Sequence, residues 1–160
     1  MKISFIGNFK DVQSFNNKAT VVTLTGRFKM PDWWHRIPHD VYEWIDTHPS
    51  VNVNESFGTA EVILVVQGKA VCAEEDEFNA ALGEWIAESR AKIKLYKFMY
   101  TLCKKLLAYY FTAMYGNREV DLVRESHTEP PRSCIWSYLN KYRELVIKES
   151  HHLGKLLEEV

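Results

Sequence analysis

The stretch that decides the fold is residues 79–116, NAALGEWIAESRAKIKLYKFMYTLCKKLLAYYFTAMYG. It contains no proline, and its apolar residues recur at alternating steps of three and four, which places them on one face of an α-helix. Asn79 is a favourable N-cap and Gly116 a favourable stop. One long helix, the spine of the core, is therefore predicted. Two lines share its broad apolar face: Leu82, Trp85, Ser89, Lys92, Tyr96, Met99, Cys103, Leu106 and Tyr110, and Ile86, Ile93, Tyr100, Leu107 and Met114.

A second amphipathic helix is predicted over residues 134–160, with Ser133 as its cap. The polar segment before it contains Pro130 and Pro131 and returns the chain. We expect the second helix to lie antiparallel to the first and, together with it, to cover a sheet. Its apolar line, interrupted only by Glu149, consists of Ile135, Leu139, Tyr142, Val146, Leu153, Leu156 and Val160.

Residues 1–73 carry strand patterns. Ile3 and Phe5 alternate with polar residues, the run KATVVTLTGRF at 18–28 is rich in Val and Thr, and TAEVILVV follows at 59–66. Gln67-Gly68 then has the composition of a hairpin turn before a further short strand. The predicted class is α+β: a small antiparallel sheet of β-hairpins followed by two long antiparallel helices, in a single domain over residues 1–160.

Residues 30–58 form an insertion between the predicted strands, with three prolines and the tryptophans Trp33, Trp34 and Trp44. A short helix is predicted over residues 38–47, in which Val41, Trp44 and Ile45 share one side. The aromatic content of this Trp-rich insertion indicates that it packs onto its own sheet, a neighbouring subunit or a ligand.

The composition narrows the class of protein. A chain of 160 residues with 46% hydrophobic content is long enough for one domain with a real core. A net charge of −1 excludes a uniformly basic coat for nucleic acid. Three cysteines without C-x-x-C spacing are typical of a reducing compartment. With no signal peptide and no long apolar run, we expect a cytoplasmic protein without a membrane segment.

No catalytic motif is visible. The serines lie in no nucleophile elbow, there is no Gly-rich phosphate loop, and the acidic run at 74–77 has the pattern of a solvated turn. His35 and His39 are four residues apart, but Pro38 interrupts the helix that would bring them onto one face as metal ligands. We therefore expect no enzyme, no catalytic residue, no metal and no cofactor.

The rear half of the long helix is uniformly basic. Arg90, Lys97 and Lys104 are spaced by seven, and the small residues Gly83 and Ala87 extend the same side. The residues that flank this line are Lys94, Thr101 and Lys105. One interpretation is a binding surface that a phosphate or an acidic protein approaches closely. The other is a solvated face whose lysines complement the helix dipole. Aromatic residues beside such cations are also what a nucleotide pocket requires.

Residues 60–94 contain a recognisable pattern, in which a Gly-x-Ala-x-Cys strand and an acidic turn precede a helix. The chain resembles here the anti-Thoeris cyclic-nucleotide sponge family of small phage-encoded anti-defence proteins. That family's fold, an antiparallel sheet followed by two antiparallel helices, is similar to the order predicted above. The matching residues are Gly68, Ala70, Cys72, Glu75, Asp76, Phe78, Asn79, Gly83, Ile86, Ala87, Arg90 and Ala91.

The resemblance implies sequestration without catalysis. Such a protein binds a cyclic ADP-ribose isomer or a cyclic oligonucleotide, the immune signal of the host, in pockets where the protomers of a homo-oligomer meet. A phage-encoded member acts in the cytoplasm of the host cell. Arg90 belongs to the matching pattern, and Lys94 and Lys97 follow it on the basic side. Tyr115, Asn117 and Arg143 are expected to complete the pocket.

Two other functions remain open from the sequence. A protein-directed inhibitor of a bacterial immune effector, similar in role to anti-CRISPR proteins, would dock through the Trp-rich insertion and the acidic run. A single-stranded nucleic-acid binding protein would use the basic helix and the aromatic residues.

Overall fold

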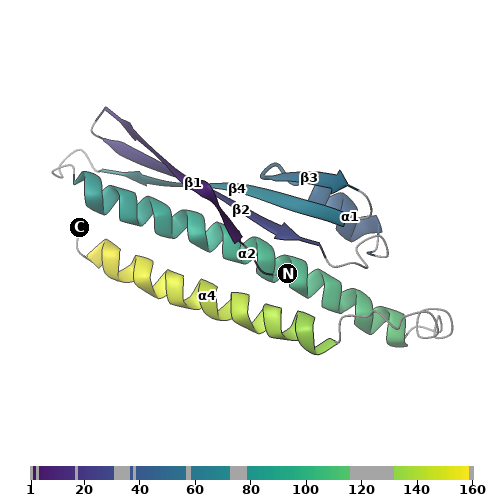
Figure 1. The fold of residues 1–160 in the computed structure, drawn as a ribbon. Coiled ribbons are helices and arrows are strands. Elements are labelled where there is room, and N and C mark those ends of the chain that lie inside the picture. The colour runs from purple at the N-terminus through teal and green to yellow at the C-terminus, as the bar shows by residue number, and fades with distance from the viewer. Residues whose placement is uncertain are drawn as a thin grey trace.

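The structure of the chain is a computed structural model that describes residues 2, 4–16, 18–30, 37, 39–56, 59–72, 79–115 and 132–158. A four-stranded antiparallel sheet in the N-terminal half precedes the two long helices, so the predicted α+β class is confirmed (Figure 1). The elements are β1 (Ser4–Phe15), β2 (Ala19–Lys29), α1 (His39–Asp46), β3 (Val51–Ser56), β4 (Thr59–Val71), α2 (Ala80–Tyr115) and α4 (Arg132–Glu158).

The sheet has the strand order β1-β2-β4-β3, with every neighbouring pair antiparallel. Asn16, in the turn between β1 and β2, has a φ of 48°, in the left-handed region that Asn tolerates better than most residues. Side chains alternate along β2, and Val22, Leu24 and Phe28 are buried on the face toward α2. This period of two is the strand signal that residues 18–28 carried.

Three strand predictions need correction. β1 is a strand of 12 residues and not a short piece around Ile3 and Phe5. β4 continues through Gln67 and Gly68, which pair with Thr23 and Val22 of β2, so no hairpin turn interrupts it. β3 lies within the insertion and was not predicted. Gly68, which indicated a turn in the sequence, instead lies within β4, at the point where α2 passes directly over the strand.

The close approach of α2 to the sheet occurs at Gly68. A Cβ atom on this residue would lie 1.8 Å from the carbonyl oxygen of Ala87 and 2.6 Å from the amide nitrogen of Ala91. Gly83 lies similarly over Thr20, with 3.1 Å between its notional Cβ and the Thr20 hydroxyl. The prediction that Gly83 and Ala87 admit an external backbone or ligand is therefore wrong for Ala87, which is fully buried against the chain's own sheet.

α2 begins as predicted. The amide of Leu82 donates to the side-chain oxygen of Asn79 at 3.1 Å, which is an N-cap hydrogen bond. The helix then runs for 36 residues along β2 and β4. Leu95, Leu102 and Leu106 are fully buried along it. The prediction that this helix is the spine of the core is confirmed.

α4 packs along α2, and Figure 1 shows the two helices antiparallel, with α2 between α4 and the sheet. Ile135, Tyr142 and Leu156 are buried, in agreement with the predicted apolar line. Glu149, which interrupts that line, accepts a hydrogen bond of 2.7 Å from the hydroxyl of buried Ser89. Ser89, in the apolar line of α2, and Glu149, in the apolar line of α4, therefore form a hydrogen bond with each other.

Two predictions about the second helix are wrong. α4 starts at Arg132, before Ser133, so the predicted start at residue 134 is too late. α4 also packs on α2 and not across the sheet, because one helix already covers the inner faces of β2 and β4. The resulting order of layers is sheet, α2, α4.

The described part of the insertion packs inward. Val41 and Ile45 of α1 are buried, and Trp44 stacks on Phe98 of α2 with 4.9 Å between ring centroids. The predicted short helix, with these three residues on one side, is confirmed. It is present in addition to the two long helices. Trp33, Trp34 and His35 lie outside the described residues, so the Trp-rich part of the insertion stays a prediction.

An ion-pair network ties α2 to the edge of the sheet. Lys10 of β1 contacts the carboxylates of Glu84, at 2.6 Å, and Glu88, and Glu88 also contacts Lys92 at 2.7 Å. Desolvation would raise the pKa of Glu88, but the hydrogen bonds from Lys10 and Lys92 outweigh it and lower that pKa. For Lys10 and Lys92 desolvation is likewise outweighed, and each pKa is raised.

Gly68→Ala should destabilise the protein strongly, because the new methyl group meets helix backbone that has to move. We expect a loss of roughly 3 kcal/mol in unfolding free energy, the upper part of the usual range for overpacking. Gly83→Ala is the comparison, since its methyl group meets only the Thr20 side chain and gains helix propensity; its cost should be below about 1 kcal/mol. Denaturant unfolding measures both, and equal effects would contradict the close approach.

Glu88→Gln tests the ion-pair network through pH. Because the pKa of Glu88 is lowered in the folded state, its contribution is present above the pKa of an unfolded Glu, about 4.3, and is lost as pH falls through the folded value. The variant should lose about 1 kcal/mol at pH 7 and decline less than wild type between pH 5 and pH 3. Glu43→Gln, at an exposed position of α1, is the control for carboxylate removal. Parallel curves for wild type and Glu88→Gln would refute the network.

Candidate functional site

The candidate binding site lies where β4 extends beyond its pairing with the shorter strand β3. β3 begins at Val51, whereas β4 continues past its pairing with β3 to Val71. The last link between the two segments is the amide of Val65, which donates to the carbonyl of Ser50 at 2.8 Å. Beyond this point β4 has no neighbouring strand on that edge among the described residues, and the space is bordered by α2 instead.

Cations of α2 occupy the open edge of β4. The ammonium group of Lys94 donates to the carbonyl of Gln67 at 2.6 Å, and the guanidinium group of Arg90 donates to the carbonyl of Lys69. Both oxygens belong to alternate residues of β4, whose backbone groups point to the unpaired edge. These hydrogen bonds saturate carbonyls that would otherwise be available to another strand. Arg90 and Lys94 therefore cap the unpaired edge of β4. The sequence did not indicate this structural role.

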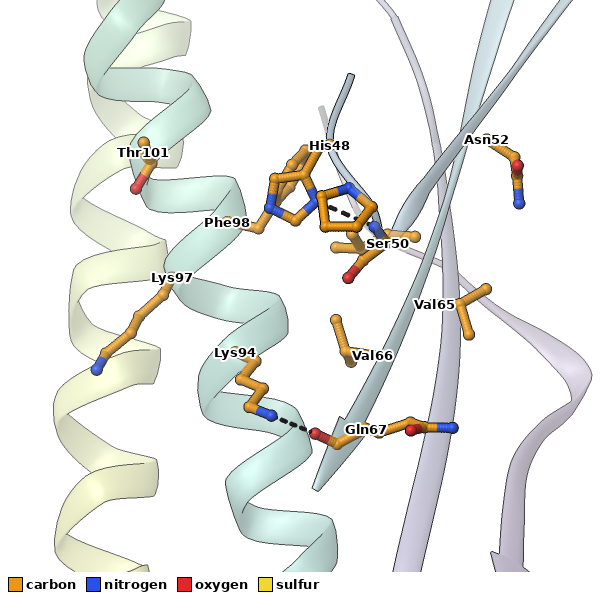
Figure 2. A pocket seen from close by; sticks show the side chains of 12 residues that line it. His48, Ser50, Asn52, Val65, Val66, Gln67, Lys94, Lys97, Phe98 and Thr101 are labelled. Atoms are coloured by element: carbon orange, nitrogen blue, oxygen red, sulfur yellow. Dashed lines mark hydrogen bonds between the residues drawn. The ribbon is translucent and has the colours of Figure 1, made fainter. Parts of the chain in front are cut away.

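A cleft of about 690 Å³ lies between this edge and α2. Figure 2 shows its walls: the turn before β3 at the top, β4 on one side and α2 on the other. Lys94 reaches across to Gln67, whereas the ammonium end of Lys97 points away from β4. The lining consists of His48, Pro49, Ser50, Asn52, Leu64, Val65, Val66, Gln67, Lys94, Lys97, Phe98 and Thr101.

The turn that closes the cleft is held by His48. The amide of Ser50 donates to Nδ1 of His48 at 3.2 Å, and the carbonyl of His48 accepts from the amide of Val51 at 3.0 Å. Since Nδ1 is the acceptor, the proton of the neutral imidazole is on Nε2. His48 thus orders the turn with one nitrogen and keeps a donor on the other.

An aromatic wall stands next to the cleft. Phe98 packs against Trp44 on one side and against His48, with 5.0 Å between ring centroids. The ammonium group of Lys105 lies 5.3 Å from the centroid of Trp44, a cation–π distance. Trp44 is therefore engaged by both Phe98 and Lys105. A half-buried aromatic ring and a cation are thus paired here, although Trp44 was not among the rings expected to lie beside a cation.

The structure brings together part of the predicted site. Lys94 and Lys97 line one cleft, and Arg90 lies one helical turn before Lys94 on the same helix. Arg143 is exposed on α4, and no α4 residue is among the described residues that line the cleft. Tyr115 ends α2, about 27 Å along the helix from Lys97, and its side chain is not described. Asn117 lies outside the described residues.

Several lining residues were missed by sequence reasoning. His48, Ser50 and Asn52 belong to a segment that was assigned to the insertion without a strand, and Gln67 was placed in a turn. Their approach to α2 depends on the pairing of β3 with β4, which is a contact between distant parts of the sequence. Thr101, by contrast, was predicted to flank the basic line, and it lines the cleft four residues after Lys97.

The remaining chemistry is limited in the described part of the chain. Burial raises the pKa of the Cys103 thiol to about 12, so this cysteine is protonated at neutral pH and is a core residue rather than a nucleophile. Within the described ranges, no three His, Cys, Asp or Glu side chains gather as metal ligands would. Among the same residues, no helix combines the length and apolarity that crossing a membrane demands.

Comparison with other proteins leaves the cleft as the basis of the functional argument. No family model, curated protein or solved structure matches this chain.

Proposed function

We propose that this chain is a binding protein that sequesters an anionic nucleotide signal, a cyclic ADP-ribose isomer or a cyclic oligonucleotide, in the cleft between β3, β4 and α2. The observation that carries the proposal is a cleft that Lys94 and Lys97 both line and whose volume lies within the usual range for small-molecule sites. The activity proposed is retention of the ligand, without a chemical step. A homo-oligomer in the cytoplasm of a phage-infected host is part of the same proposal.

The two lysines suit a phosphate-bearing ligand in different ways. The ammonium group of Lys94 has three donors and uses one on Gln67, so it can hold a phosphate oxygen while the edge of β4 stays closed. Lys97 is exposed at the rim, and its side chain reorients within nanoseconds. We expect Lys97 to turn toward β4 when an anion enters.

Recognition of the rest of the ligand falls to polar groups. Ser50 can contribute a hydroxyl group from the turn before β3, Thr101 one from α2, and Nε2 of His48 a donor. Because Trp44 is already engaged by Phe98 and Lys105, stacking on that ring does not contribute to affinity in this arrangement. The base is expected to be selected through hydrogen bonds.

Extraction tests the proposal first. The protein is purified from cells that produce a cyclic nucleotide signal and is then denatured, and the supernatant is analysed by mass spectrometry. A nucleotide in stoichiometric amount supports the proposal. Adding cyclic ADP-ribose isomers or cyclic di- and trinucleotides to ligand-free protein should raise its melting temperature, because ligand that binds only the folded state stabilises it by mass action. The absence of both effects would reject sequestration.

Lys97→Ala should reduce the affinity for that nucleotide by 10-fold or more, since a hydrogen bond to a charged group contributes about 1.5–3 kcal/mol. Stability should be unchanged, because the side chain is exposed. Lys104→Ala is the matched control, an exposed lysine seven residues later that does not line the cleft. Calorimetric titration measures both, and equal losses would mean that general charge attracts the ligand.

Binding to oligonucleotides with a steep dependence on salt would favour the single-stranded nucleic-acid alternative instead. The protein-directed alternative depends on Trp33, Trp34 and the acidic run at 74–77. These residues lie outside the described ones, so that alternative stays a prediction from the sequence.

A further inference from the structure

Backbone groups of β4 alternate in direction along the strand, and every second residue faces the edge that β3 leaves unpaired. In an antiparallel sheet the amide and the carbonyl of one residue point to the same neighbouring strand. The amide of Val65 donates to the carbonyl of Ser50, so the odd-numbered residues of β4 face the side of β3. Gln67 and Lys69 therefore direct both their amide and their carbonyl to the open edge.

The two carbonyls of this edge are occupied, whereas the two amides are not. Lys94 donates to the carbonyl of Gln67 at 2.6 Å, as Figure 2 shows, and Arg90 donates to the carbonyl of Lys69. Among the described residues, no acceptor meets the amide of Gln67 or that of Lys69. The edge therefore presents only donors here, an amide and a cation at Gln67 and again at Lys69.

The positive charge of this edge is not neutralised within the described part of the chain. The cations of the ion pairs found there are Lys10, Arg27 and Lys92. Neither Arg90 nor Lys94 contacts a carboxylate among the same residues. Hydrogen bonds from cations and from backbone amides are the means by which proteins hold oxyanions. The complementary ligand is an anion whose backbone contains acceptors and no donors.

We infer that this edge is a binding site for two adjacent phosphates of a sugar–phosphate chain. One phosphate accepts from the amide of Gln67 and from Lys94, and the other accepts from the amide of Lys69 and from Arg90. The two positions are two residues apart in an antiparallel strand, which is about 6.8 Å. Phosphates separated by a sugar can span this distance. The two phosphorus atoms of a pyrophosphate share one bridging oxygen and lie closer together.

The inference rests on the proposed function in that the ligand enters through the same cleft, which Gln67 and Lys94 line. It adds Arg90 and two backbone amides to the groups that bind the ligand. It also selects between the two proposed classes of ligand. A cyclic oligonucleotide has phosphates separated by sugars, whereas the cyclic ADP-ribose isomers have a pyrophosphate.

The same arrangement disfavours a peptide strand at this edge. An added strand would bring an amide of its own to each edge carbonyl. Those carbonyls already accept from Lys94 and Arg90. A phosphodiester backbone brings no donor, so both cations can keep their carbonyls while the ligand binds. An ammonium group has three N–H donors and a guanidinium group five, which leaves donors for the phosphates.

Hydrogen exchange of the backbone amides tests the site in the wild-type protein. The probes are cyclic di-AMP, cyclic di-GMP and cyclic tri-AMP, with cyclic ADP-ribose and the linear dinucleotide pApA for comparison. Under the cyclic oligonucleotide that binds most tightly, exchange at Gln67 and Lys69 should slow by about 10-fold or more. Gly68 is the internal control, because its amide faces β2. Val71 faces the open edge without a described cation on its carbonyl, and its exchange should stay unchanged.

Arg90→Ala should weaken the binding of the same cyclic oligonucleotide by about 10-fold or more in calorimetric titration. Lys104→Ala removes an exposed cation of α2 away from this edge and should leave the affinity unchanged. Equal losses from the two variants would overturn the site at Arg90.

The remaining outcomes separate the inference from the proposed function. Tighter binding of cyclic ADP-ribose, or unchanged exchange at Gln67 and Lys69, would overturn the inference and leave the proposed function in place. Equal protection of Val71 would indicate an added strand and would also overturn it. Equal affinity and protection with pApA would support the edge site and reject a cyclic signal. If no probe binds, the proposed function fails and the inference fails with it.

Discussion

The contact on which the structure depends is the close approach of the α2 backbone to β4 at Gly68. With no side chain at this position, Ala87 and Ala91 lie directly on the strand, and the helix axis is fixed along β2 and β4. Dispersion and apolar burial are strongest where surfaces meet without gaps, so this approach allows Leu95, Leu102 and the inner faces of both strands to form one core. The orientation of every other face of α2 follows from it.

One of those faces carries Arg90 and Lys94 to the edge of β4, and Lys97 lies on the same helix as a lining residue of the cleft. Because β3 ends its pairing before β4 does, the cations border an open strand edge and a cleft. Arg90 and Lys94 satisfy edge carbonyls, which discourages pairing with another strand. A single helix side thus protects the sheet and supplies positive charge to the cleft. The solvated-face interpretation and the binding interpretation each describe part of this surface.

The opposite face of α2 receives α4, so that α2 is covered by the sheet on one side and by a helix on the other. The hydrogen bond between Ser89 and Glu149 lies within this helix pair. A buried polar pair fixes the register of two helices better than apolar contacts alone, since a shift of one turn would leave both groups unsatisfied.

The amino-acid sequence predicts the long helix, its cap at Asn79, the apolar line of α4 and the strand at β2, because these features depend on periodicity and capping within short stretches. It also placed Lys94 and Lys97 on one helix side. Contacts between distant segments account for the rest: β4 passes through Gly68, β3 pairs with β4, Glu149 meets Ser89, and His48 and Ser50 lie beside α2. A glycine has the same composition signal in a turn and under a helix, and strand pairing between distant segments leaves no local pattern. The cleft arises from such pairing, so its walls were decided by the fold.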